Sequence, residues 1–351
     1  MHDPDITPGD PLLARLRRLP KVVLHDHLDG GLRPATLMAL LQARGLALPA
    51  PDLEGVEAWF QAGAHAGSLE TYLEGFALTV AAMATPEAMA RVACEAAEDA
   101  LADGAVLAEF RIAPLLFEAH GVAGDAAVEA MLDGLSRSKL PSGLIVCAMR
   151  HLPPAETLRA VELALRWQGS GVVAFDLAGG EAGHPPAEHA AALQRARDAG
   201  LPLTLHAGEA DAAERVLEAV QLGASRIGHG VRLADAIGDP ARAHLVDAVV
   251  ASGAHLEVCP TSNVHTGAAV SVAAHPIGPL WRAGVGLSVQ TDNRLMSCIT
   301  HSGEALRLVR EAGFSEADLV QMGLQAAAHS FLGAAARERA TAALRAWAVE
   351  G

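Results

Sequence analysis

The sequence predicts an α/β protein whose strands and helices alternate to form a (β/α)8 barrel, and three observations lead to that prediction. The chain has 351 residues, of which 51% are hydrophobic, so it can bury one large core. Eight short apolar runs with β-branched residues recur along the chain, as buried parallel strands do. Helical stretches rich in Ala, Leu, Glu and Arg separate most of them. Eight such units favour a closed barrel, while some irregular units keep an open doubly wound sheet as the alternative.

Gly and Pro residues bound most of these runs, as they commonly bound strands. The predicted strands are Val22–Leu28, Ala105–Ile112, Leu144–Met149, Val172–Leu177, Leu201–His206, Arg226–His229, Ala254–Cys259 and Val285–Gln290. The first two are unusually far apart, and the excess, residues 34–103, has the composition of several helices. An insertion there lies at the carboxyl-end face, where barrel enzymes have their sites, so we expect it to form a lid. Residues 1–18 form an N-terminal extension, and the whole chain, 1–351, is expected to be a single domain because no linker or repeat divides it.

The charge balance restricts the partners that the protein can have. The formal net charge is -15, from 41 acidic and 26 basic residues. Such a surface repels phosphate backbones and anionic lipids, and the 3% aromatic content offers few platforms for base stacking. We therefore expect a small-molecule ligand, with no nucleic acid and no membrane partner. The oligomeric state is left open by the sequence.

The cysteines and the N-terminal sequence indicate a compartment. The four cysteines are scattered without a CxxC pair, so they are expected to be reduced thiols. The first residues lack the basic and apolar regions of a signal peptide, and no run is apolar enough to span a bilayer. These features predict a cytoplasmic protein.

Side chains that bind metals follow several of the predicted strands. His25 and His27 are two residues apart at the end of the first strand, so their side chains share one face. His206 ends the fifth strand, and Asp292 follows the eighth. Because the strand ends of a barrel converge on one mouth, three imidazoles and one carboxylate would meet there, a set suited to Zn²⁺. A lone HxH pair more often satisfies ordinary hydrogen bonds, but the combined pattern favours a metal.

Most other histidines are expected to lie on the surface or to have their hydrogen bonds satisfied. These are His2, His65, His120, His151, His184, His189, His244, His255, His275 and His301, whereas His265 and His329 are left unassigned. The segment Glu109-Phe110-Arg111 in the second strand is interpreted as an ion pair inside the barrel with a structural role.

Six motifs resemble those of the adenosine deaminase family of metal-dependent hydrolases. In chain order they are LHDHLDGGLRP, FDLAGGE, LHAGE, RIGHG, CPTSN and TDN, and they span nearly the whole chain, from about residue 20 to residue 330. The resemblance implies a TIM barrel that holds a single zinc ion. Related barrel hydrolases with two metals carry a carboxylated lysine on the fourth strand, and here no lysine follows that strand, which also favours one metal per chain.

The resemblance also implies a role for individual residues. His25, His27, His206 and Asp292 match the zinc ligands, Glu209 matches the proton donor, His229 matches the base that orients water, and Asp29 and Gly179 match contacts to the ribose and the purine ring. The chemistry agrees with these roles, because zinc lowers the pKa of its bound water to about 7 and a protonated carboxyl can neutralise charge that builds on ring N1. The structural alternatives are a helix-start carboxylate for Glu209 and a core histidine for His229.

One position departs from the family pattern, and one helical stripe has two interpretations. The family commonly has a second Asp where this chain has Asn293, whose amide can still donate to purine N7, although ring specificity becomes less certain. An ordinary turn Asn is the alternative. A helix over the insertion would place Leu69, Tyr72, Leu73 and Phe76 on one face, which either packs in the core or lines the substrate pocket.

We therefore expect a zinc-dependent aminohydrolase that converts adenosine, and also 2′-deoxyadenosine, to inosine and ammonia in purine salvage. The alternative within the same chemistry is another 6-aminopurine, such as aminofutalosine or adenine, and a different class is a non-catalytic nucleoside-binding relative. A carboxylate at Asp29 disfavours a 5′-phosphate, with a repulsion of about 4 kcal/mol at about 4 Å and an effective dielectric constant near 20. Arg33 is expected to cap or position the first insertion helix rather than to bind phosphate.

Overall fold

The structure is a computed structural model that describes residues 9–65 and 69–350, without the side chains of residues 69–74 and 350. All eight predicted strands are confirmed, and their ends differ from the predicted ones by three residues at most. They are β1 (Lys21–His27), β2 (Ala105–Ile112), β3 (Ser142–Met149), β4 (Val172–Ala178), β5 (Thr204–Ala207), β6 (Arg226–His229), β7 (His255–Val258) and β8 (Leu287–Val289).

The strands form two parallel four-stranded sheets, β1-β2-β3-β4 and β5-β6-β7-β8, which meet at both edges. At one edge the Phe175 N–H donates to the Pro202 carbonyl at 2.9 Å, next to a parallel bridge to Leu203. At the other, Asp26 and Asp292 form a bridge, and the His27 N–H donates to the Asp292 carbonyl at 2.8 Å. These contacts join the two sheets into a ring, which confirms the (β/α)8 barrel.

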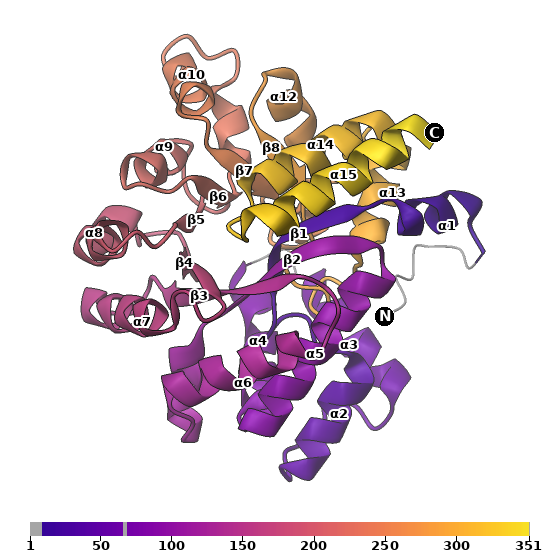
Figure 1. Ribbon diagram of the computed structural model, residues 1–351, viewed down its shortest axis with the longest axis vertical. Coiled ribbons are helices and arrows are strands. Elements are labelled where there is room, and N and C mark those ends of the chain that lie inside the picture. The colour runs from indigo at the N-terminus through magenta and orange to yellow at the C-terminus, as the bar shows by residue number, and fades with distance from the viewer. Residues whose placement is uncertain (1–8, 66–68, 351) are drawn as a thin grey trace.

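Helices surround the ring, as Figure 1 shows. They are α1 (Pro11–Arg18), α2 (Pro34–Ala43), α3 (Leu53–Ala64), α4 (Leu69–Met83), α5 (Pro86–Ala102), α6 (Gly124–Ser136), α7 (Pro154–Trp167), α8 (Ala190–Asp198), α9 (Glu214–Gln221), α10 (Ala243–Ser252), α11 (Pro260–His265), α12 (Ile277–Arg282), α13 (His301–Glu311), α14 (Glu316–His329) and α15 (Ala334–Glu350). Short 3-10 turns lie at Pro114–His120, Pro186–His189 and Val231–Ala236. Among the described helices, none combines the length and the apolar character that crossing a bilayer requires.

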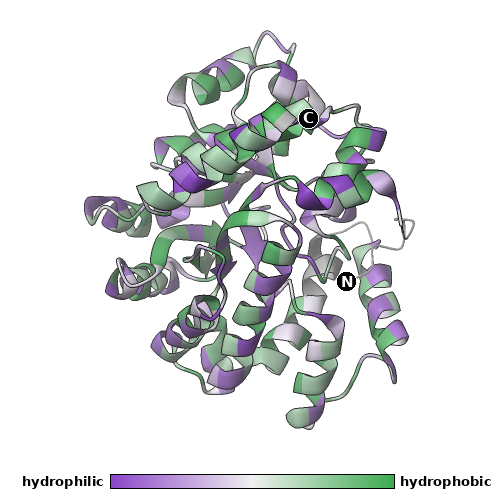
Figure 2. Cartoon of the chain, turned by 45° about the vertical axis from the view of Figure 1, so that its right-hand side comes forward, coloured by the Kyte–Doolittle hydropathy of each residue, from purple (hydrophilic) through white to green (hydrophobic). Residues whose placement is uncertain are grey.

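Several helices begin at a capping residue that the local sequence supplies. Asp10 accepts from the Leu12 N–H at the start of α1, and Thr85 accepts from the Ala88 N–H at the start of α5, each just before a proline. Hydrophilic and hydrophobic residues alternate along the outer helices in Figure 2, as expected for helices that pack one face on the barrel. The positions of these helices therefore follow largely from local sequence.

The insertion between β1 and β2 consists of helices α2 to α5, as the sequence predicts. Helix α5 packs on β2 and on α6, so it serves as the crossover helix of this unit. The outer face of β1 and β2 is covered from the other end of the chain, where Val22 and Leu24 pack against Ala326 of α14 and Leu344 of α15. The insertion is thereby left free to extend around the carboxyl ends of the strands.

Charged residues, and not only apolar ones, fill the inside of the barrel. Arg226 of β6 pairs with Glu109 of β2 and with Glu257 of β7, each at 2.5 Å. Arg111 pairs with Asp176 of β4 at 2.8 Å and with Glu257 at 2.6 Å. Both guanidiniums are fully buried. Glu109 and Arg111 thus lie inside the barrel as expected, but the prediction that they pair with each other is wrong, because each finds an opposite charge on another strand across the ring.

We predict that His301, at the start of α13, makes the fold sensitive to acid. Burial lowers the pKa of His301 to about 3, and its Nε2–H donates to the Val289 carbonyl at 2.8 Å. In the unfolded chain the ring takes up a proton near pH 6.5. The unfolded state therefore binds more protons between pH 6.5 and about 3, and the free energy of unfolding falls as the pH falls through that range.

The measurement is urea unfolding of the parent protein and of His301→Gln at pH 7.5 and 5.5. The parent should lose about 1 kcal/mol more than the variant between these two pH values. Equal losses in the two proteins would show that His301 does not remain neutral in the folded state.

Candidate active site

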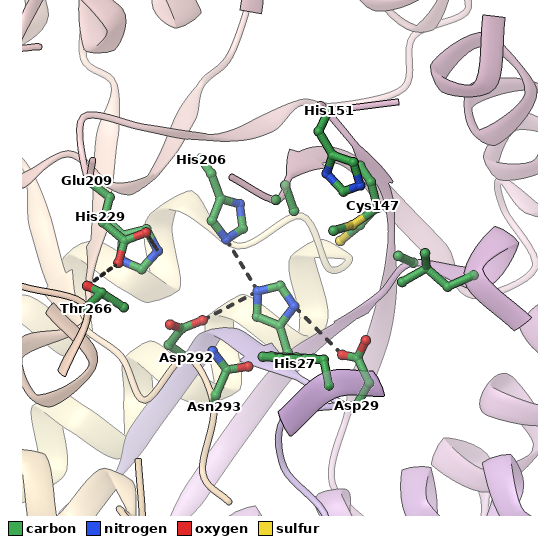
Figure 3. A pocket seen from close by; sticks show the side chains of 16 residues that line it. His27, Asp29, Cys147, His151, His206, Glu209, His229, Thr266, Asp292 and Asn293 are labelled. Carbon is green, nitrogen blue, oxygen red and sulfur yellow. Dashed lines mark hydrogen bonds and ion pairs between the residues drawn. The ribbon is translucent and has the colours of Figure 1, made fainter. Parts of the chain in front are cut away.

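The structure brings together the four residues that the sequence singled out as metal ligands. His25 and His27 come from β1, His206 from β5, and Asp292 from the segment after β8, and one ligand atom from each lies within 4.8 Å of all the others. Asp292 Oδ1 is 3.2 Å from His25 Nε2 and 3.4 Å from His27 Nε2, and the Nε2 atoms of His27 and His206 are 3.3 Å apart. Figure 3 shows His27, His206 and Asp292 converging on one point.

Buried carboxylates behind the cluster orient two of the imidazoles. His25 Nδ1 is 2.9 Å from Glu257 Oε2, and His206 Nδ1 is 3.0 Å from Asp176 Oδ2. Because Nδ1 donates to a carboxylate in each case, the neutral ring presents a bare Nε2 to the cluster. Burial alone would raise the pKa of Glu257, but the charges of Arg111 and Arg226 hold that pKa well below its ordinary value, so the carboxylate stays ionised.

The cluster fits a divalent cation. Among the described residues, the buried His25 Nε2 has no hydrogen-bond partner and lies 3.2 Å from Asp292 Oδ1, and His27 Nε2 and His206 Nε2 face each other at 3.3 Å, an arrangement that a shared cation would stabilise. The network of buried ion pairs joined to the cluster also has more negative than positive charge. It holds four carboxylates and two guanidiniums, so a divalent ion at the cluster would offset the two negative charges in excess. The carboxylates are Glu109, Asp176, Glu257 and Asp292, and the guanidiniums are those of Arg111 and Arg226.

Two residues of the site have a backbone conformation that is rare outside glycine. His229, at the end of β6, has a φ of 64°, and Asp292 has a φ of 61°. L residues reach this left-handed region at a cost, and such strain is concentrated at functional sites. Here the unusual backbone turns both side chains from the strand ends toward the pocket.

Glu209 and His229 lie next to the cluster and face each other. Glu209 Oε2 is 3.5 Å from His229 Nε2, and Glu209 Oε1 accepts from Thr266 Oγ1 at 2.9 Å (Figure 3). Glu209 Oε1 also accepts from Asn263 Nδ2 at 3.3 Å. The loop that carries Glu209 is held by Glu181, whose carboxylate accepts from the backbone N–H groups of residues 208–211. The structure therefore brings Glu209 and His229 together, as the sequence predicts. It adds Thr266, Asn263 and Glu181 as polar partners of this part of the site.

A cavity of about 250 Å³ lies over these residues at the carboxyl ends of the strands. Asp29, Gly179 and Asn293 all line it, as does Phe76 of α4. The side chains of the other stripe residues lie outside the described part of the structure; these are Leu69, Tyr72 and Leu73. The pocket thus contains every predicted substrate-contacting residue whose side chain is described.

Glycine is required at two positions of the pocket. A Cβ on Gly30 would lie 2.0 Å from Asn293 Oδ1, so the glycine after Asp29 lets Asn293 reach its place. Gly179 has a φ of 92°, and a Cβ there would approach Met149 Cε to 3.0 Å.

Burial raises the pKa of Asp29 to about 7, so this carboxyl is partly protonated at neutral pH.

The structure adds detail to two expectations about the surroundings. His151 is exposed, as expected, and it also lines the pocket. Arg33 precedes α2 but makes no capping hydrogen bond with its side chain, and its guanidinium instead donates to Asp99 of α5 at 2.7 Å. Arg33 therefore ties α2 to α5 and does not reach the pocket.

Sequence reasoning missed the residues that support the site. Asp176 and Glu181 lie in the FDLAGGE motif and Asn263 lies in CPTSN, but these motifs do not reveal which atoms the side chains contact. The one available signal was a charge inside an apolar strand, as at Glu257 in β7 and Asp176 in β4. A buried charge needs a partner, so each of these positions pointed to a polar interior.

Comparisons with known proteins agree with this arrangement. Residues 20–347 match the family model described as Adenosine deaminase. An adenosine deaminase of Mycobacterium tuberculosis is 43% identical over 338 residues, which cover 92% of each chain, and one of Mycobacterium avium is 42% identical over 91% of this chain and 92% of its own.

Solved structures share the fold. An adenine deaminase from Arthrobacter aurescens superposes with a TM-score of 0.86 at 26% identity, over 95% of this chain and 99% of its own. An N6-mAMP deaminase of Arabidopsis superposes with a TM-score of 0.82 at 24% identity, over 95% of this chain and 99% of its own. At 24% identity, the similarity to the Arabidopsis structure supports the fold alone.

Proposed function

Because this chain belongs to the adenosine deaminase family, we propose that it hydrolyses adenosine, and also 2′-deoxyadenosine, to inosine and ammonia with one zinc ion per chain. The observation that carries the proposal is the meeting of the His/His/His/Asp cluster with Glu209 and His229 in one pocket. The relatives at 43% identity favour adenosine, whereas the structural likeness to an adenine deaminase keeps free adenine as a second candidate.

The metal would be held by the cluster already described, His25, His27, His206 and Asp292. A bound divalent ion lowers the pKa of water and so makes hydroxide available near neutral pH. Three imidazoles and one carboxylate suit zinc, although other divalent transition metals accept the same donors. The end of β4 carries no lysine that could bridge a second ion, which supports a single ion.

The protein's own residues would transfer protons, orient the water and bind the ring. Glu209 would donate a proton to ring N1 as a hydroxyl group forms its bond to carbon 6, and His229 would orient the attacking water. The proton of the new hydroxyl group then passes to the amino nitrogen, which leaves as ammonia while carbon 6 becomes a carbonyl. Asn293 would donate to purine N7, and the backbone at Gly179 would contact the ring.

The other end of the pocket favours a nucleoside. Asp29 is placed to hydrogen-bond a hydroxyl of the ribose, and in the described part of the chain neither Lys nor Arg lines the pocket. A 5′-phosphate would therefore meet a carboxyl group and no cation. Arg33, the nearest basic residue along the sequence, is paired with Asp99.

We also propose that residues 34–103 act as a lid within a single-domain protein. Phe76 supports this role, since it reaches the pocket from α4. Leu69, Tyr72 and Leu73 would continue the same apolar wall along the helix. A role in purine salvage follows from the deamination of free nucleosides, and the four cysteines, which form no disulfide, suit a reducing cytoplasm.

We predict that the purified protein contains about one zinc ion per chain. Chelation should abolish deamination and lower the melting temperature, because the metal binds the folded state and compensates its buried charge. His206→Ala should lose the metal as well. Elemental analysis of the parent and the variant makes the test, and two metal ions per parent chain would contradict the proposal of a single zinc ion.

We predict that Glu209→Gln retains zinc and still binds nucleoside but loses about 100-fold to 10,000-fold in kcat, because an amide cannot serve as the acid. The measurements are the loss of adenosine absorbance near 265 nm, metal content and product binding. The matched control is Glu188→Gln, which changes an exposed carboxylate in the 3-10 turn Pro186–His189. A variant as active as the parent would remove Glu209 from the proposed acid role.

We predict that kcat/KM ranks adenosine above AMP, adenine and aminofutalosine in one assay. AMP should be a poor substrate because no cation lies near its phosphate. Adenine should be a poor substrate because it has no ribose hydroxyl that could bind Asp29. Asp29→Asn should lower kcat/KM for adenosine more than for adenine. Turnover of AMP at the adenosine rate would contradict the proposed role of Asp29, and preference for adenine or aminofutalosine would move the proposal to that substrate.

A further inference from the structure

A chain of hydrogen bonds runs from a backbone amide behind the site to the two residues proposed to handle protons. It begins at Ile277, in the first turn of α12, whose N–H donates to His275 Nδ1 at 3.0 Å. His275 is buried, and burial lowers its pKa to about 3, so the ring is neutral at working pH. Because Nδ1 accepts the amide hydrogen, the single ring hydrogen of His275 lies on Nε2.

The hydrogen on His275 determines the orientation of the next side chain. His275 Nε2 is 3.3 Å from Oδ1 of Asn263, a fully buried residue of α11. A donor at that position requires the amide oxygen of Asn263 to face it. The amide NH2 group must then point the other way, toward Glu209 and His229.

The two hydrogens of that amide meet two different acceptors. Asn263 Nδ2 is 3.1 Å from His229 Nδ1 and 3.3 Å from Glu209 Oε1. His229 Nδ1 therefore accepts, so the neutral ring of His229 carries its hydrogen on Nε2, the atom that faces Glu209 and the pocket.

The same contacts distinguish the two oxygens of Glu209. Oε1 accepts from Asn263 and also from Thr266 Oγ1 at 2.9 Å, so two donors already occupy it. Among the described residues, the one donor near Oε2 is His229 Nε2, at 3.5 Å. A proton on this carboxyl group therefore belongs on Oε2, which Figure 3 shows on the side away from Thr266.

We propose that Asn263, oriented by His275, is a positioning residue that holds His229 in the Nε2–H tautomer and makes Oε2 the proton-carrying oxygen of Glu209. The catalytic consequence rests on the proposed function, whereas the tautomer does not. Neutral His229 then orients the attacking water by donating from Nε2 and cannot accept that water's proton at the same atom. Glu209 Oε2 is the atom left to take a proton from water and to pass it to ring N1.

The tautomer can be read directly by NMR of the zinc-loaded protein labelled with [¹⁵N]histidine. A long-range ¹H–¹⁵N spectrum separates protonated from bare ring nitrogens, and His229→Gln identifies the His229 signals by their loss. We expect a protonated Nε2 and a bare Nδ1 in the parent. A protonated Nδ1 on neutral His229 would overturn the proposal whatever the protein's activity.

Asn263→Asp tests the proposal by replacing the amide donor with an acceptor of the same shape. The hydrogen of His229 should move to Nδ1, and kcat should fall about 100-fold while KM changes little. His275→Leu, which removes the donor to Asn263, should lower kcat about 10-fold or more, and His275→Gln should recover part of the loss because its amide can donate. Metal content and circular dichroism show whether each variant has folded.

His301→Gln is the matched control, because it replaces another buried histidine whose Nε2 donates to a carbonyl away from this chain of bonds. It should keep the parent kcat and the parent His229 spectrum at neutral pH. Folded Asn263→Asp protein with unchanged kcat and an unchanged His229 tautomer would overturn the inference. A parent protein that deaminates no 6-aminopurine, yet shows the Nε2–H tautomer, would refute the proposed function and leave the tautomer assignment standing.

Discussion

The site depends on one buried guanidinium, that of Arg111. It binds Asp176 and Glu257 at the same time, and these two carboxylates orient His206 and His25. A buried carboxylate without a cation would be costly, so this arrangement requires a positive charge inside the barrel. Even with Arg226 as a second cation, the ion-pair network joined to the cluster has an excess of negative charge, which favours a divalent cation at the mouth of the barrel.

The closure of the barrel brings the site residues together and fixes the direction in which their side chains point. Strand ends that lie far apart in the sequence bring His25, His206 and Asp292 within reach of one ion, and the left-handed backbone at His229 and Asp292 turns both residues inward. Behind this layer, polar side chains of α11 and the following loop restrict which atoms of Glu209 and His229 can carry hydrogen. The site is therefore preorganised on the metal side by carboxylates and on the proton-transfer side by amide and hydroxyl groups.

The pocket above the site is largely apolar, and its few polar groups have distinct positions. Asp29 lines the pocket next to His27 and Asn293 follows Asp292, while Phe76 and Leu116 add apolar surface. A planar purine can be buried against such walls, and hydrogen bonds at its edge then select the base. In the proposed function, the sugar and the ring would therefore be recognised by different residues.

The sequence by itself determined the strands, the barrel and the cluster of metal-binding residues, because these depend on short-range patterns. Alternation within β1 places His25 and His27 on one face, and the strand ends of a barrel must meet. The partners of Arg111, the lining position of His151 and the contacts of Asn263 were decided only by the tertiary structure. Each involves residues that the folded ring brings together from distant elements, as with His229 and Asn263 or Arg111 and Glu257. Which of several buried charges pair, and which way an amide points, follows from packing across the barrel and not from spacing along the chain.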